Sequence, residues 1–235
     1  MTLFRRFYPV LYACFTLVFV GDIVPCFSQI TPPEEYLGFK PGADFELATY
    51  EQWVGYFDLI AGQTDRLQLI DMGLTSAGRQ MKYAVISSEE NMADLEKYKE
   101  ITRTLSLAQD ISEQEAVQLA EEGKAVVWIE GGIHSTESSP PMHQFQLAYD
   151  LVTGIDKTTE SIRENVILVL MIANPDGMTI VADWYMENVG SEYETSRPPV
   201  LYHIYAGHDN NRDTFLANLV ETQNINRLMG TVWYP

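Results

Sequence analysis

A histidine and a carboxylate stand close together in residues 130–137, which read EGGIHSTE. His134 and Glu137 are separated by only two residues, so a single tight turn can direct both side chains to one point. An imidazole and a carboxylate in this arrangement supply two of the three protein ligands of a typical catalytic zinc site. Gly131 and Gly132 allow the backbone to approach closely there. Taken alone, the pattern is equally consistent with two interpretations. The two residues are a pair of metal ligands, or they are an ordinary histidine and glutamate on the surface.

A second polar segment, Ala173-Asn-Pro-Asp-Gly177, directly follows the apolar run at residues 166–172. Asn-Pro and Asp-Gly are both common in turns. We therefore predict an ordinary turn that has a structural role beside the site.

A third segment, residues 207–213, reads GHDNNRD. Asn211 and Arg212 could receive a carboxylate, because a planar guanidinium binds both carboxylate oxygens. On spacing alone, an arginine paired with Asp209 or Asp213 at the start of a helix is the favoured interpretation.

Charge and cysteine content narrow the classes of function. The 235 residues carry 15 Lys and Arg against 33 Asp and Glu, a formal net charge of −18. Such a surface repels phosphate, so we expect neither nucleic acid nor anionic membrane as a partner. The two cysteines, Cys14 and Cys26, fall in the N-terminal leader. A mature chain would therefore have to hold a metal with His, Asp and Glu.

Residues 1–28 have the features of a signal peptide. Arg5 and Arg6 precede an apolar run from Phe7 to Val20, and the small residue Ser28 offers a cleavage point. We predict an exported protein, secreted or periplasmic, without a stable membrane anchor. The alternative is that the apolar run stays attached as an anchor.

The remaining chain alternates between helical and strand patterns. After an irregular lead-in at 29–45, apolar runs at 125–129 and 166–172 predict strands buried on both faces. The fold class is therefore α/β, a three-layer α/β/α sandwich around a mixed sheet. Further strands are predicted at 67–72 and 82–87. Helices are predicted from Thr49, a candidate N-cap, to about Ile60, and at 92–105, 113–122, 140–152, 178–188 and 213–229. Ser112 followed by Glu115 has the pattern of a capping box at the start of the helix 113–122.

In their residues and their order, the three polar segments resemble those of the zinc carboxypeptidases related to carboxypeptidase A. GGIHSTE, NPDG and Asp209-x-Asn211-Arg212 carry the resemblance, which covers about residues 67–234. It implies an α/β/α domain at 46–235, one zinc ion per complete domain, and peptide or protein C-termini as substrates.

The resemblance also implies a role for each matching residue. His134 and Glu137 would be zinc ligands, and Asp209 would hydrogen-bond the ligating histidine. Asn211 and Arg212 would bind the C-terminal carboxylate of a peptide. Arg197 would stabilise the oxyanion, with Arg163 as a weaker candidate for that role.

The sequence departs from the family's pattern after Arg212. The third zinc ligand, a histidine, and the general-base glutamate are expected well beyond this residue, and His143, His203 and His208 all precede it. We therefore expect an N-terminal part of the catalytic domain, inactive by itself. Two alternatives are a related zinc amidohydrolase that removes acyl groups, and a non-catalytic binding or remnant protein.

Overall fold

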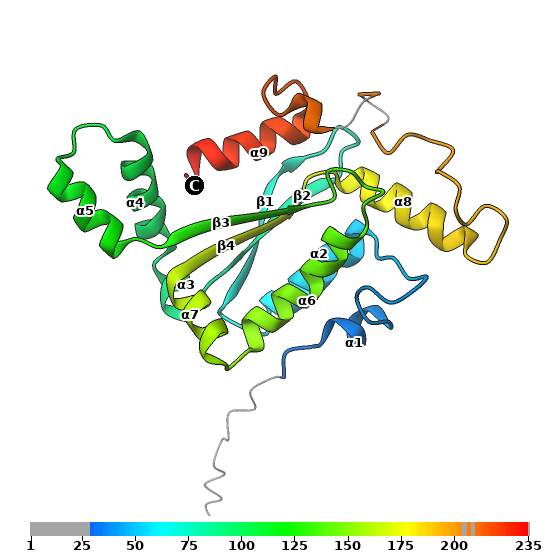
Figure 1. Cartoon of the computed structure of the whole chain (residues 1–235), viewed down its shortest axis with the longest axis horizontal. Helices are drawn as coiled ribbons and strands as arrows, with labels where there is room; N and C mark the ends of the chain where they lie inside the picture. Colours follow the sequence, from blue (N-terminus) through cyan, green and yellow to red (C-terminus); the bar gives the residue numbers. More distant parts are fainter. Residues whose placement is uncertain (1–28, 204–205, 208–209, 235) are drawn as a thin grey trace, which may run out of the picture.

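The computed structural model describes residues 29–203, 206–207 and 210–234. The predicted leader at 1–28 lies outside these residues. The described part forms a mixed sheet with the strand order β1-β2-β4-β3, covered by helices on both faces (Figure 1). This arrangement confirms the predicted α/β/α sandwich.

Strands β1 (Leu67–Leu74) and β2 (Gln80–Ile86) form an antiparallel hairpin, as predicted. The register shifts at a bulge between Asp71 and Gly73, and Gly73 has a φ of 132°. A bulge of this kind bends a strand locally. Here it accompanies the close approach of Asn224, whose side chain lies 2.4 Å from the position that a Cβ of Gly73 would occupy.

Strand β4 (Val166–Ile172) lies between β2, to which it is antiparallel, and β3 (Ala125–Gly131), to which it is parallel. Nearly all of its side chains are buried, which confirms the prediction from its continuous apolar run. The run at 125–129 was correctly predicted to be a strand, β3, but the prediction that it is buried on both faces was wrong. This strand pairs only with β4 among the described strands, and Val127 is 40% exposed. Apolar composition alone does not distinguish an edge strand from a central one.

Side chains from alternate positions of the strands enter two separate hydrophobic cores, one on each face of the sheet. On one face, Leu168 and Leu170 pack under α2 and α6, where Trp53 and Phe57 stack with ring centroids 4.2 Å apart. On the other face, Val169 packs with residues of α4 and α9. Full burial of each large apolar side chain contributes roughly 1.5–3 kcal/mol, so both cores hold the helices firmly.

The helices follow the predicted order with local differences. Their bounds are α1 Pro33–Leu37, α2 Tyr50–Ala61, α3 Glu89–Ala93, α4 Leu95–Leu107, α5 Glu113–Glu122, α6 Ser139–Thr153, α7 Lys157–Asn165, α8 Pro175–Asn188 and α9 Val220–Thr231. Thr49 caps α2 and a capping box at Ser112 starts α5, as predicted, and Thr49 also forms a capping box. The single helix predicted at 92–105 is two helices, α3 and α4, that meet at Asp94. Helix α1 lies within the lead-in at 29–45, and α7 was not predicted.

Within the described part of the chain, no helix is both long and apolar enough to cross a membrane.

Candidate metal and substrate site

The site begins where β3 ends, in the turn from Gly131 to Glu137. Gln144 of α6, which is fully buried, stabilises the strands below it by donating to the carbonyls of Met171 (3.0 Å) and Ile129 (3.3 Å). At the start of the turn Gly132 has a φ of 75°, a conformation that favours glycine. The backbone N–H of Glu137 donates to the carbonyl of His134 at 2.9 Å, which closes the turn.

This turn brings the two predicted metal ligands together. Nδ1 of His134 lies 3.1 Å from Oε1 of Glu137. Two atoms that each lie about 2.0–2.1 Å from a tetrahedral zinc ion are roughly 3.3 Å from each other, so the pair fits zinc in donor type and separation. Nε2 of His134 is buried and has no hydrogen-bond partner among the described residues. In those residues, however, no group of three or more His, Cys, Asp and Glu could hold a metal ion.

The segment predicted as an ordinary turn, residues 173–177, is the start of α8. Asn174 is the N-cap, and its Oδ1 accepts from the N–H of Gly177 at 2.9 Å. Its Nδ2 donates to the carbonyl of Tyr202 at 3.1 Å. The turn prediction was therefore wrong, because Pro175 is favourable in the first turn of a helix as well as in a turn. The predicted structural role beside the site is supported by these contacts.

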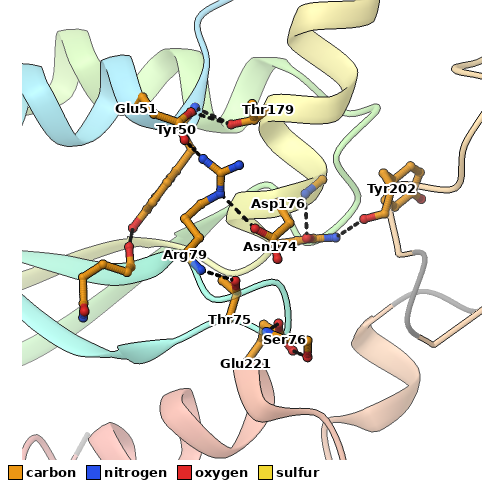
Figure 2. Close-up of polar contacts among 12 residues, drawn as sticks. Tyr50, Glu51, Thr75, Ser76, Arg79, Asn174, Asp176, Thr179, Tyr202 and Glu221 are labelled. Carbon is orange, nitrogen blue, oxygen red and sulfur yellow. Dashed lines mark hydrogen bonds and ion pairs between the residues drawn. The ribbon is translucent and has the colours of Figure 1, made fainter.

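Sequence reasoning missed an ionic network that anchors the start of α8 (Figure 2). Arg79, in the hairpin turn directly before β2, donates from Nε to Oδ1 of the buried Asp176 at 2.9 Å and pairs with Glu51 of α2. Thr179 of α8 donates to Oε2 of Glu51 at 2.8 Å. The network thus connects the hairpin, α2 and α8. No spacing in the sequence indicates it, because its three charged residues come from distant segments.

The third polar segment forms a short 3₁₀ helix at Asn210–Asp213. Nη1 of Arg212 donates to Oδ1 of Asn211 at 3.2 Å. Asp213 is buried and accepts from the N–H groups of Asn218 (2.9 Å) and Leu219 (2.8 Å) instead of pairing with Arg212. Asp209, which the resemblance predicts to hydrogen-bond the ligating histidine, lies outside the described residues.

Arg212 and Arg197 both line a cavity of about 1020 Å³. Thr136, from the turn that carries His134, lines the same cavity. Within the described residues, neither arginine forms an ion pair with a carboxylate. Unneutralised guanidinium groups at a cavity can bind an anionic ligand. Asn211, His134 and Glu137 are not part of this cavity's lining.

The other arginine considered for the oxyanion role lies elsewhere. Arg163 is buried in α7, where its Nη1 donates to the carbonyls of Leu151 (2.6 Å) and Gly154 (2.8 Å) at the end of α6. Burial lowers the pKa of this guanidinium from its ordinary value. Its contacts assign it a structural role.

Known proteins resemble the chain in sequence and structure. The sequence profile of the family described as "Zinc carboxypeptidase" matches residues 54–227. The crystal structure of carboxypeptidase A from Helicoverpa armigera is 17% identical, with a TM-score of 0.42, and the match covers 69% of this chain and 33% of that one. For thrombin activatable fibrinolysis inhibitor (TAFI) the identity is 13% and the TM-score 0.43, with 68% of this chain and 31% of that one covered.

The chain thus spans about a third of the length of these two structures. No curated protein matches it. The family match covers most of the chain, including the turn with His134 and Glu137 and the segment with Asn211 and Arg212. The chain belongs to the zinc carboxypeptidase family.

Proposed function

We propose that the chain is part of a zinc-dependent carboxypeptidase that removes C-terminal residues from peptides. The observation that carries this proposal is the convergence of His134 Nδ1 and Glu137 Oε1, 3.1 Å apart, at the end of β3. The adjoining cavity with Arg197 and Arg212 supports a ligand that carries negative charge.

In this proposal, His134 and Glu137 hold the zinc ion, and Asp209 accepts a hydrogen bond from His134 Nε2 and thereby fixes its tautomer. When bound, zinc acidifies a water molecule and polarises the peptide carbonyl. Asn211 and Arg212 hold the terminal carboxylate, and Arg197 stabilises the negative oxygen that develops on the scissile carbonyl. The third ligand and the general base belong to residues other than those described.

Zinc binding tests the ligand assignment directly. We expect the purified chain to bind zinc weakly, because the assignment gives it two protein ligands and a catalytic zinc site usually has three. His134→Ala and Glu137→Ala should each lower the zinc affinity at least tenfold in a chelator competition assay. His143→Ala, on the exposed side of α6, is the matched control and should leave the affinity unchanged. Equal affinity in all four proteins would contradict the assignment.

Peptide binding distinguishes the carboxypeptidase from the zinc amidohydrolase alternative. A carboxypeptidase site should bind a peptide with a free C-terminus more tightly than its C-terminal amide, and Arg212→Gln should abolish the difference. Arg103→Gln, on the exposed face of α4, is the control. We expect little or no hydrolysis by this chain. Ordinary peptidase turnover would contradict the proposal that the third zinc ligand and the general base are residues other than those described.

We also propose that the protein is exported. The basic start and the apolar run from Phe7 to Val20 support a signal peptide that is removed after Ser28. Sequencing the N-terminus of the exported protein should give Gln29 as the first residue. An intact Met1 on the exported protein would contradict cleavage and favour the membrane-anchored alternative.

A further inference from the structure

The cavity beside the candidate site is partly lined by residues to which the proposed function assigns no role. Its remaining sides are formed by α8, the segment 195–203 and the lead-in segment 43–47. The lead-in segment therefore borders the same space as Arg197 and Arg212, although it lies far from them in the sequence.

Contacts with α8 hold the lead-in segment in this position. The N–H of Leu47 approaches Sδ of Met186 at 3.3 Å, and just beyond the segment the N–H of Tyr50, the first residue of α2, donates to Oγ1 of Thr179 at 3.2 Å. The lead-in thus runs along α8 from its C-terminal half toward its start. Thr179 and Met186 are seven residues apart, about 10 Å along the helix axis.

The backbone of the lead-in is strained at the cavity. Phe45 has a φ of 67°, which is rare for a residue with a Cβ, and its side chain is 59% exposed. Strained backbone and exposed aromatic rings both concentrate at ligand-binding sites. Trp184 also lines this cavity, and its Nε1 is buried without a hydrogen-bond partner among the described residues.

The lead-in wall is acidic. Asp44 and Glu46 both line the cavity, and neither forms an ion pair with a described residue. Desolvation, followed by the negative charges of Glu194 and Asp44, raises the pKa of the Tyr185 hydroxyl above its ordinary value. Among the described residues, this cavity is thus lined by two arginines and two carboxylates that have no ion-pair partner.

We propose that the lead-in segment 43–47 is a specificity wall of the substrate cleft and selects peptides with a cationic group upstream of their terminal carboxylate. The cation is a lysine or arginine side chain, or the free α-amino group of a short peptide. The acidic segment and Arg212 line the same cavity, and an extended chain rises about 3.3 Å per residue, so we expect the cation a few residues before the C-terminus. This inference rests on the proposed function, which assigns the carboxylate to Arg212.

Calorimetric titration of the zinc-treated full chain with short peptides tests the proposal. Acetyl-Lys-Ala-Ala-Phe carries the cation as a side chain, acetyl-norleucyl-Ala-Ala-Phe lacks it, and unacetylated Ala-Ala-Ala-Phe carries it as an α-amino group. The C-terminal amide of the lysine peptide tests the carboxylate separately. Ion pairs at a solvent-exposed wall give small gains, so we expect the lysine peptide to bind roughly two- to fivefold more tightly than the norleucine peptide at low salt.

The double variant Asp44→Asn, Glu46→Gln should bring this ratio to about one without weakening binding of the norleucine peptide. The double variant Glu113→Gln, Glu121→Gln removes the same charge from exposed positions on α5, at the far end of the molecule from α8 (Figure 1), and should keep the ratio. Equal melting temperatures of the three proteins would verify their folding. A preference for the lysine peptide or for the unacetylated peptide identifies the source of the cation.

The outcomes separate this inference from the proposed function. If the free acid binds better than the amide but lysine and norleucine peptides bind equally, the specificity wall is refuted and the proposed function stands. A lysine preference that persists in the Asp44→Asn, Glu46→Gln variant also refutes the wall. If free acid and amide bind equally, or no peptide binds, the proposed function fails, and this inference fails with it.

Discussion

At Gly177, three parts of the candidate site are in close contact. A Cβ at this position would lie 2.2 Å from Oγ of Ser135 and 2.7 Å from the carbonyl oxygen of Tyr202. Ser135 stands between the proposed ligands, and Tyr202 belongs to the segment that lines the cavity. Gly177→Ala should therefore lower the free energy of unfolding by about 1–3 kcal/mol, because overpacking forces the backbone to move. Urea unfolding measures this loss, and zinc affinity should fall with it.

A second helical glycine provides the control for this substitution. Outside the neighbouring backbone of its own helix, Gly230 of α9 has no described atom within 4 Å of the corresponding Cβ position. Gly230→Ala should raise stability by up to about 1 kcal/mol, since alanine has the higher helix propensity. Opposite signs for the two variants would support close packing at Gly177, whereas two stabilised variants would refute it.

Among the elements, α9 departs furthest from its predicted start, and Asp213 explains the difference. The sequence pattern predicted a helix from about residue 213, but the helix begins at Val220. Asp213 instead binds the N–H groups of Asn218 and Leu219 and so stabilises a loop before the helix. Aspartate competes with the helical backbone for hydrogen bonds, so a helix start near this residue type is hard to predict.

The same contacts give α9 a pH-dependent anchor. Burial alone would raise the pKa of Asp213, but the N–H groups of Leu219 and Asn218 outweigh it and hold the pKa below its ordinary value. A carboxylate with a lowered pKa contributes stability above its unfolded pKa of about 3.9, and this contribution disappears as the pH falls through the folded pKa. Asp213→Asn should cost about 1–3 kcal/mol at pH 7. In urea unfolding, the difference from the natural chain should shrink at acidic pH.

Asp183→Asn, at an exposed position on α8, is the control for this pH series. Its free energy of unfolding should stay within about 0.5 kcal/mol of the natural chain at each pH. An Asp213→Asn deficit that grows as the pH falls would contradict the assigned sign of the pKa shift.

Local sequence patterns predicted where helices and strands begin better than they predicted which other elements lie beside them. Thr49 and Ser112 identified helix starts because a cap depends on residues within one turn. The apolar run of β3 could not indicate that the strand is at an edge, because this depends on which strands pair beside it. The same distinction applies to the site. The spacing of His134 and Glu137 predicted their approach, whereas the pairing of Arg79 with Asp176 joins segments that only the fold brings together.

For the whole molecule, the dominant electrostatic quantity is the net charge of −18. Individual ion pairs on the surface contribute little, about 0–1 kcal/mol each, and most of those described are exposed. Repulsion among excess carboxylates acts over the entire surface and destabilises the compact state. The two effects respond to salt with opposite signs, because screening weakens attraction and repulsion alike.

Salt should therefore stabilise this protein at neutral pH. Raising NaCl from about 10 mM to about 150 mM shortens the Debye length from roughly 30 Å to 8 Å, which screens the distant repulsions first. We expect the melting temperature at pH 7 to rise by a few degrees over this range, measured by calorimetry at constant zinc concentration. At about pH 4.5, where many carboxylates are protonated, the rise should largely vanish. A melting temperature that falls with salt at pH 7 would show that attractive pairs such as Arg66 with Glu89 outweigh the repulsion.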